Sequence, residues 1–425
     1  MKRTKMLKAS SMVYALFVVT ILAIISGSIV LSSYYYNLQL IDYTQRIKQQ
    51  SYVQSGVNLL LEENSFKLPY KATRKLFEDE QSEIQLSKRW WGLMELITVE
   101  SVWKNNSVGK VYLIGFKDNF NDRISLYLKD NNRSLSLSGK TIIQGNAYLP
   151  KSGVKRAYVD GKGFAGSKLI DGDILESKSE LPKLNKKLYA NVISNFESTN
   201  ITDSVITFEE LKSVEQFENG FSSKTIVVQL PDQTRLNQLN VTGNVILKSR
   251  GTLYIENTCA FKDVLIYAKK IVFKKEFEGK LQAFASDTIL VEKDCKFGYP
   301  SVLGLVKDES NIRQYLAIDN GSSFVGTIAQ LSFDEEVKSN ELIRIEKESN
   351  VEGIIYSQGQ LYLGGTVFGS VYTGTFILST PSSIYENHLL DAEINSLKLN
   401  KAFVGIDIPV ENKVSTKEIV CEFEW

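Results

Sequence analysis

The only histidine in the chain is His388, which lies in the polar segment SSIYENHLLD. A Ser-His-Asp or Cys-His site would need this imidazole as its base, and no nucleophile motif lies near it. A zinc site needs about four nitrogen or sulfur ligands. The histidine and three scattered cysteines, Cys259, Cys295 and Cys421, do not form such a set. We therefore predict no catalytic residue and no metal site among these side chains.

Gly161, Gly163 and Gly166 match the pattern GxGxxG. A dinucleotide site would need a strand before this pattern, a helix after it and an acidic residue about twenty positions further on. The short strand-like run RAYVD precedes it, but SKLIDGDI follows and contains another glycine turn. The pattern therefore predicts turn glycines, and we expect no bound cofactor.

Carboxylates offer the remaining routes to chemistry. Asp160, Asp171 and Asp173 could hold Ca²⁺ with turn carbonyls, but no EF-hand spacing is present, so solvated turn residues are expected. A pair of carboxylates can also hydrolyse a glycosidic bond. Because the chain has 49 Asp and Glu residues and no cluster among them stands out, we predict a non-enzyme. A carbohydrate-active β-helix enzyme is an alternative.

The composition limits the class of protein. The 425 residues are 43% apolar, which allows a sizeable core, and 20 Tyr with 21 Phe favour strands. Lysine and arginine number 50 against 49 acidic residues, so no nucleic-acid partner is expected. Three cysteines exclude a scaffold stapled entirely by disulfides.

The N-terminus predicts a membrane span. No charged residue occurs between Lys8 and Asp42, and residues 12–31 are mostly Val, Ile, Leu, Phe and Ala. Twenty apolar residues match a hydrocarbon layer of about 30 Å, so the lipid bilayer is the expected partner. Four basic residues precede the span and predict a cytoplasmic N-terminus: Lys2, Arg3, Lys5 and Lys8. The body is then expected in the periplasm or at the cell exterior, anchored to a bacterial inner membrane.

Two other interpretations of this stretch remain open. Ser26 and Ser28 are spaced like the small residues of a signal-peptide cleavage site. The stretch could also be a buried helix of a soluble protein.

After the span, apolar residues continue at helical spacing through YNLQLIDYTQRIKQQSYVQSGVNLLLEE, which predicts one helix over about residues 10–64.

The basic leader, apolar helix and amphipathic continuation resemble type IV pilin-like proteins, especially the group of minor pilins and secretion pseudopilins. This resemblance covers about 60 residues and implies a subunit of a pilus or secretion-type assembly. A cut after Ala9 would put Tyr14 at the fifth mature position, where that family has glutamate.

Residues 65–140 predict a small α+β unit, with a short helix and a strand before residue 105 and a strand at 110–117. Two alternating runs joined at Asn131-Asn132 predict a β-hairpin. Tryptophans in this region are expected to be packing anchors: Trp90, Trp91 and Trp103.

A short phrase then recurs, in which glycine lies two positions from an apolar residue on each side, as in Val351-Glu-Gly353-Ile-Ile355. Rows 246–263, 264–281 and 282–299 align without a gap. Three columns of these rows are apolar: Leu253, Ile271 and Ile289; Ile255, Phe273 and Val291; Cys259, Phe277 and Cys295. A fixed period near twenty residues predicts a solenoid whose columns stack into ladders.

The fold class predicted is mainly β: an irregular single-stranded β-helix with a small α+β unit and a long N-terminal helix. The segments are 1–64 for leader, membrane helix and stalk, 65–140 for the small unit, 141–378 for the solenoid and 379–425 for a strand and loop tail. In this tail, AFVGIDIPV and EIVCEFEW are the expected strands. Insertions are expected at about 176–235, with a helix around 184–197, and at about 307–342. The ladders and glycine phrases resemble bactofilin-type polymer-forming β-helices. The function predicted is a membrane-anchored structural or interaction protein of the cell envelope, with protein partners or self-association through the solenoid.

Overall fold

The computed structural model is mainly β, with one long N-terminal helix and a large parallel sheet. The structure describes residues 10–62, 71–75, 82–197, 204–307, 313–332, 341–411 and 413–423. Two compact units divide the chain. The first comprises Met1–Leu59, Ala72–Leu86 and Val99–Gly109, and the second comprises the rest.

The helix α1 (Ser10–Leu61) confirms the predicted helix over the described residues. At about 1.5 Å per residue its 52 residues extend roughly 78 Å. It is long and apolar enough to cross a membrane, and its most apolar window is 0% buried within the chain. That exposure contradicts the alternative of a buried helix inside a soluble core.

The last quarter of α1 packs within the first unit. Burial begins at Gln49, whose side-chain nitrogen donates hydrogen bonds to the carbonyl oxygens of Ser101 and Asn106, both at 3.2 Å. Val53 and Val57 are buried one turn apart. Glycine at position 56 allows close contact with the strands, since a Cβ there would meet a methyl group of Val99 at 2.6 Å.

An antiparallel sheet has the strand order β1-β2-β3-β4-β31. Its strands are β1 (Lys71–Arg74), β2 (Glu83–Trp91), β3 (Met94–Trp103), β4 (Asn106–Asp118) and β31 (Ser415–Phe423). The predicted strands at 110–117 and near the C-terminus are confirmed. The short helix expected before residue 105 falls partly outside the described residues, and those described there form strands and turns. The strand expected over AFVGIDIPV is wrong, because only an isolated bridge between Gly405 and Phe116 forms.

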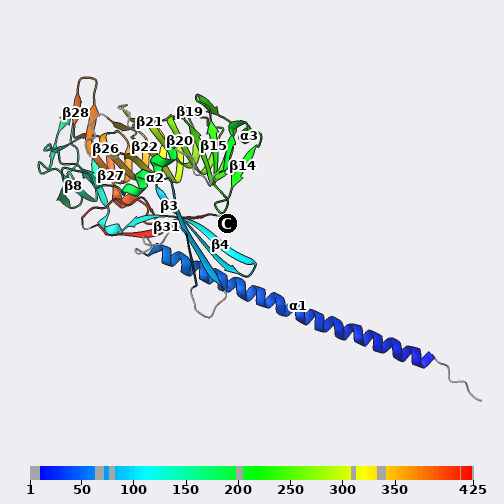
Figure 1. Cartoon of the computed structure of the whole chain (residues 1–425). Coiled ribbons are helices and arrows are strands. Elements are labelled where there is room, and N and C mark those ends of the chain that lie inside the picture. The colour runs from blue at the N-terminus through cyan, green and yellow to red at the C-terminus, as the bar shows by residue number, and fades with distance from the viewer. Residues whose placement is uncertain are drawn as a thin grey trace, which may run out of the picture. The chain divides into compact units, whose positions relative to one another are not determined.

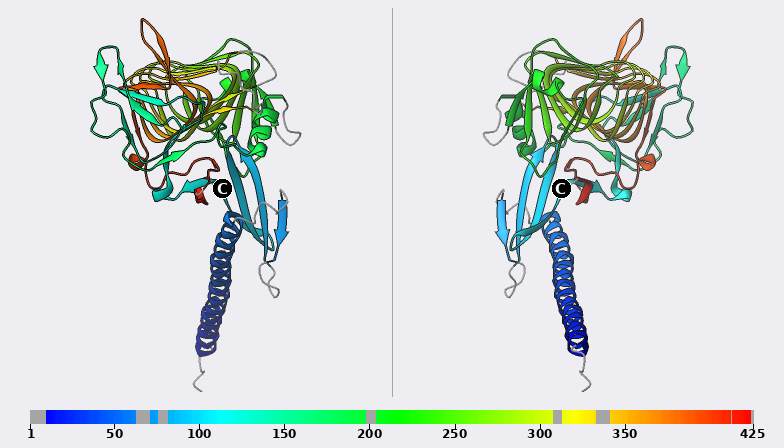
Figure 2. Two further views of the ribbon diagram at one scale, coloured as in Figure 1. Left: turned by 90° about the vertical axis from the view of Figure 1, so that its left-hand side faces the viewer. Right: turned by 90° about the vertical axis from the view of Figure 1, so that its right-hand side faces the viewer.

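The large sheet is built from parallel strands, each paired with the next row of the chain. Its main strands lie side by side in Figure 1, and the views in Figure 2 look along the stack. They are β15 (Ile226–Leu230), β18 (Val245–Ser249), β20 (Ala260–Phe273), β21 (Glu278–Val291), β22 (Lys296–Val306), β24 (Ser323–Leu331), β26 (Asn350–Leu363) and β27 (Thr366–Ser379).

The predicted apolar columns are confirmed by the register. Leu253 of β19 (Thr252–Ile255) pairs with Ile271, and Ile271 pairs with Ile289. The column continues through Leu316 of β23 (Tyr315–Ile318) and then Ile343 of β25 (Leu342–Ile345). All five side chains are fully buried. Successive rows therefore stack like coils, with their apolar side chains in one continuous core.

The recurring glycine phrase also stacks. Gly326 pairs with Gly353, and Gly353 pairs with Gly369. Their φ angles are 148°, 138° and 153°, which favour glycine. A Cβ on Gly369 would lie 1.9 Å from the carbonyl oxygen of Gly353, so the residue type is required by close approach of neighbouring coils.

The hairpin predicted at Asn131-Asn132 is wrong. Asn132 has a φ of 60° and does form a bend, but the flanking strands pair elsewhere. The first strand, β5 (Ile124–Leu128), pairs in parallel with β27 and β8 (Asn146–Leu149). The second, β6 (Leu135–Ser138), pairs in parallel with β9 (Val154–Arg156) and β29 (His388–Leu390). Each strand therefore pairs with one strand about 20 residues further on and one about 250 residues further on, and not with the other strand of the predicted hairpin.

Both expected insertions contribute elements. The first holds α2 (Lys186–Glu197), which confirms the helix predicted near 184–197. It also holds β13 (Ser204–Thr207), α3 (Phe208–Lys212), β14 (Gln216–Asn219), β15 and β16 (Thr234–Leu236). The described part of the second supplies β23 and β24 to the parallel stack.

Short elements complete the described chain. They are β7 (Ile142–Gln144), β10 (Tyr158–Val159), β11 (Lys162–Gly163), β12 (Ile174–Glu176), β17 (Asn240–Gly243), β28 (Ile384–Glu386), β30 (Glu393–Asn395) and the 3₁₀ turns Phe120–Asp122 and Ser396–Lys398.

Candidate functional site

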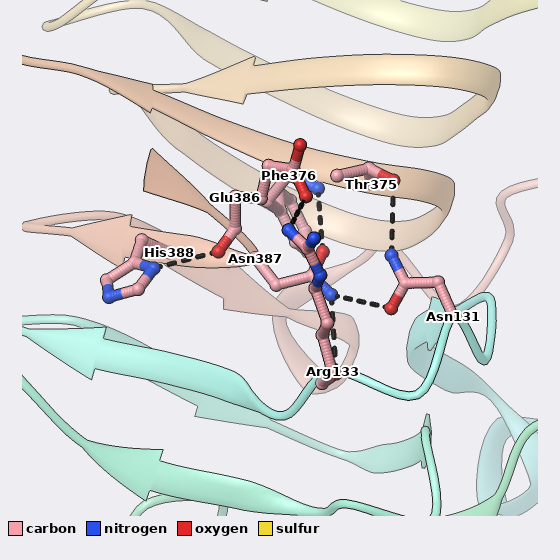
Figure 3. Close-up of polar contacts among 7 residues, drawn as sticks. All are labelled: Asn131, Arg133, Thr375, Phe376, Glu386, Asn387 and His388. Carbon is pink, nitrogen blue, oxygen red and sulfur yellow. Dashed lines mark hydrogen bonds and ion pairs between the residues drawn. The ribbon is translucent and has the colours of Figure 1, made fainter. Parts of the chain in front are cut away.

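The single histidine, His388, is the first residue of strand β29 (Figure 3). Its Nδ1 is 2.9 Å from the carbonyl oxygen of Glu386, and its ring lies 5.2 Å from that of Tyr385. Neither partner is a nucleophile or an orienting carboxylate. His388 therefore has the surroundings of a packed strand residue.

Asn387, beside the histidine, is the centre of a cluster of hydrogen bonds, here called the clip, that the sequence did not indicate (Figure 3). It is fully buried and has a φ of 51°. Its side-chain nitrogen donates to Asn131 Oδ1 at 3.0 Å and to the carbonyl oxygen of Arg133 at 3.3 Å. Its side-chain oxygen accepts from the backbone N–H of Phe376 at 3.3 Å. The clip joins the segment at Asn131 and Arg133 to the one at Phe376 and Asn387, about 250 residues further along, and Arg133 adds an ion pair with Glu386.

The cysteines are free thiols in apolar surroundings. Cys259 and Cys295 are buried in the core of the stack, as the column predicted. Burial raises the pKa of each, and that of Cys421, to about 11. A raised pKa keeps the thiol protonated, which is the opposite of the activation that a nucleophilic cysteine needs.

The glycine pattern forms a turn. Gly161 has a φ of 77° and lies between the antiparallel strands β10 and β11. Residues 164–173 contain no helix, so the strand–turn–helix context of a dinucleotide site is missing. Asp171 makes an ion pair with Lys168 at 3.0 Å. Within the described ranges, no three His, Cys, Asp or Glu side chains are placed to hold a metal ion.

Trp91 is the buried anchor that the sequence predicted. It is 2% exposed, its ring meets that of Phe221 edge-on at 5.1 Å, and its Nε1 donates to the carbonyl oxygen of Asp263 at 3.2 Å. Trp90 packs against the same core. Trp103 lies under the ammonium of Lys104, 4.3 Å from the ring centre.

A cavity of about 150 Å³, here called the α2 cavity, lies where the start of α2 and the segment before it approach β24 and β26. Its lining is part apolar and part cationic. The apolar and aromatic members are Leu181, Leu184, Leu188, Tyr189, Leu331 and Tyr356. The polar members are Lys129, Glu180, Lys183, Lys186, Gln330, Ser332 and Gln358.

Two tyrosines hold the walls of the α2 cavity together. The hydroxyl of Tyr356 donates to the carbonyl oxygen of Pro182, and that of Tyr189 donates to the carbonyl oxygen of Lys307, both at 2.9 Å. Burial raises the pKa of Tyr356 to about 12, so this hydroxyl remains a donor at neutral pH. The sequence predicted the helix at 184–197 but gave no sign of which strands it would cover.

A second cavity, of about 580 Å³, is lined mainly by β3, β4, β31 and the segment before β31. Its walls include Trp90, Met94 and Phe116. Lys417 and Glu95 form an ion pair at 3.2 Å inside it, with side chains 4% and 9% exposed. Such a buried pair fixes the position of β31 relative to β3, because separating the charges would leave one of them buried and uncompensated.

No protein-family model and no curated protein sequence matches this chain. Among solved structures, the competence-associated pilin ComZ from Thermus thermophilus aligns with 83% of this chain and 88% of its own, at 9% identity. The TM-score is 0.20, which is too low to support an argument about fold or function. The likenesses to pilin-like proteins and to bactofilins therefore remain predictions from the sequence.

Proposed function

We propose that this protein is a single-pass, membrane-anchored structural or interaction component of the cell envelope. The observation that carries the proposal is the division of α1. Its apolar first half, including Met12 at 81% exposure and Val30 at 70%, has no cover within the chain. Its last quarter is packed, from Gln49 onward. A bilayer would cover the exposed apolar run and leave the packed quarter outside the membrane.

A contact role is favoured by the ends of the parallel stack. Among the described residues, β12 pairs only with β8, and β13 pairs only with β15. Both edge strands expose apolar side chains, with Ile174 at 53% and Val205 at 56%. An exposed strand edge offers backbone hydrogen-bonding groups to another chain.

Membrane fractionation of the full chain tests the anchor. The full chain is expected in the membrane fraction after a high-salt wash, and a variant lacking residues 1–31 is expected in the soluble fraction. If expression of the full-length gene gives a soluble protein that begins just after Ser28, the anchor is overturned and a cleaved signal peptide is identified. Protease added outside intact spheroplasts should degrade the body if it faces outward.

Photocrosslinking in cells tests the contact role. A photoreactive amino acid at Ile174 or Val205 should give a defined higher-mass adduct. The same amino acid at exposed Lys155, outside these two edges, is the matched control. Equal or absent adducts at all three positions would argue against the strand edges as contact surfaces.

A second candidate function is a minor pilin-like subunit. The observation that favours it is one unbroken helix, apolar and exposed in its first half and packed against strands of the first unit in its last quarter. Mass spectrometry of the mature protein separates the two candidates. Cleavage near Ala9 or Ser10 would support a pilin-like subunit, and an intact Met1 would support the plain anchor.

A further inference from the structure

We propose that the α2 cavity binds a small organic anion, made of one apolar ring or short chain with a single carboxylate or phosphate. This inference does not depend on the proposed anchoring role. It rests on three features of the cavity: lysine side chains in its lining, a buried amide donor without a partner and an apolar wall of matching size.

The charge of the lining favours an anion. Among the described residues, the lining holds Lys129, Lys183 and Lys186 and one carboxylate, Glu180, whose oxygen lies 3.4 Å from the ammonium of Lys183. Lys183 and Lys186 also interact with other groups, so the lysine available to a ligand is Lys129. The ammonium of Lys129 has no ion pair with the described residues. The first turn of α2 adds to this charge, because a helix N-terminus carries partial positive charge.

The second feature is a buried amide with an unused donor. Gln330 lines the cavity and is 1% exposed. Its side-chain oxygen accepts from the backbone N–H of Gly359 at 3.1 Å, which fixes the orientation of the amide. Its nitrogen then has no partner among the described residues. Buried polar groups are normally satisfied, so an oxygen of a bound anion is expected to accept this hydrogen bond.

The size and wall of the cavity set the class of ligand. A water molecule takes about 30 Å³ in the liquid, so about 150 Å³ holds roughly five waters or one single-ring molecule. Leu184, Leu188 and Leu331 supply an apolar wall that water would not satisfy. An inorganic anion would leave this wall uncovered, whereas a ring with one carboxylate would contact both the leucines and the lysines.

Three probes of similar shape and different charge test the proposal: benzoate, benzamide and benzamidine. Each is titrated into the full chain in lipid nanodiscs, with empty nanodiscs as the blank, and binding is followed by ligand-observed NMR. Benzoate is expected to bind saturably at one site, uncharged benzamide more weakly, and benzamidine not at all. Equal saturation by benzoate and benzamidine would show binding that does not depend on an anion, and no saturation by benzoate would indicate a water-filled cavity; either result would overturn the proposal.

Two variants locate the binding. Lys129→Gln should weaken benzoate binding about tenfold, since it removes a charge-assisted contact, while Lys155→Gln, outside the cavity, should leave it unchanged. Leu184→Trp should fill the cavity and abolish binding. The thermal unfolding of each variant is measured in parallel to show that it is folded. Binding that survives in folded Leu184→Trp, or is equal in the two lysine variants, would place the anion elsewhere.

Discussion

The glycines of the repeated phrase are the residues at which neighbouring coils come closest. Gly326, Gly353 and Gly369 are paired across three successive strands and share a φ between 138° and 153°. Each added Cβ would fall on the carbonyl oxygen of the preceding coil. The recurrence of the phrase was visible in the sequence, and the structure supplies its cause, which is the spacing between coils.

Gly369→Ala should therefore destabilise the stack, by about 2–4 kcal/mol, because the methyl group both clashes and occupies a disfavoured backbone region. The measurement is the midpoint of chemical unfolding followed by near-ultraviolet circular dichroism. Gly298→Ala is the control, since the nearest atoms to its Cβ lie at 3.9 Å. A loss of stability that is the same for both variants would contradict the close-approach argument.

The buried thiols predict a loss of stability in alkali. Burial raises the pKa of Cys259 and Cys295 to about 11, above the value of about 8.5 in an unfolded chain. Folding therefore favours the protonated thiol, and this contribution is complete below pH 8.5 and is lost as the pH rises through 11. Iodoacetamide at pH 8 should modify neither thiol in the folded protein and both after denaturation. Rapid alkylation of the folded protein would contradict the burial.

At the scale of elements, the sequence predicted what depends on local pattern. The apolar run of α1 and the apolar column at Leu253, Ile271 and Ile289 both appear in the structure as predicted, because each depends on a local pattern of apolar residues. The rows are not gapless throughout, since the pairing of β20 with β21 shifts register between Lys262 and Val264 and again between Ala268 and Lys270. The hairpin at Asn131-Asn132 failed because the bend is local but the partners of its strands are not. β5 pairs with β27, which begins at Thr366, and no local sequence pattern can indicate a pairing between segments so far apart.

The packing of α1 from Gln49 onward can be tested within the first unit. Val57→Asp should lower the stability of that unit by about 3 kcal/mol, since it buries a charge without a partner. Hydrogen exchange at β3 residues 99–103 measures this directly and should become faster. Asn58→Asp adds the same charge at an exposed neighbour and should leave exchange unchanged. Unchanged exchange in the Val57 variant would contradict the packing.

At the scale of the whole molecule, the features missed from the sequence are those that join distant segments. The α2 cavity brings the start of α2 together with Leu331 and Tyr356, more than 140 positions further on. The clip at Asn387 does the same for Asn131 and Phe376. Each feature could be predicted only by knowing which two distant positions are in contact. A single sequence shows only which residues are neighbours along the chain. The candidate binding site was therefore unpredictable, although the helix that forms one wall of it was predicted.

The C-terminal strand β31 also joins segments that are distant in the sequence. β31 pairs antiparallel with β4 from Ser415 opposite Asp118 to Phe423 opposite Val111. It also carries the partner of buried Glu95 and stacks the ring of Phe423 on that of Phe221 at 4.0 Å. The end of the described chain thus pairs with a strand some 300 residues earlier, and its removal would expose both a strand edge and a buried charge.

Truncation after Val414 is therefore expected to lower the unfolding temperature of the protein by more than 10 °C and to promote aggregation. A synthetic peptide of residues 415–425, added in trans, should restore part of that loss in a concentration-dependent way, because binding to the folded state stabilises it by mass action. A peptide with the same residues in scrambled order should restore nothing. Lys417→Gln in the intact chain separates the two contributions, since it leaves the strand pairing and removes only the charge. If the truncated protein unfolds at the same temperature as the intact one, the C-terminal strand does not close the sheet.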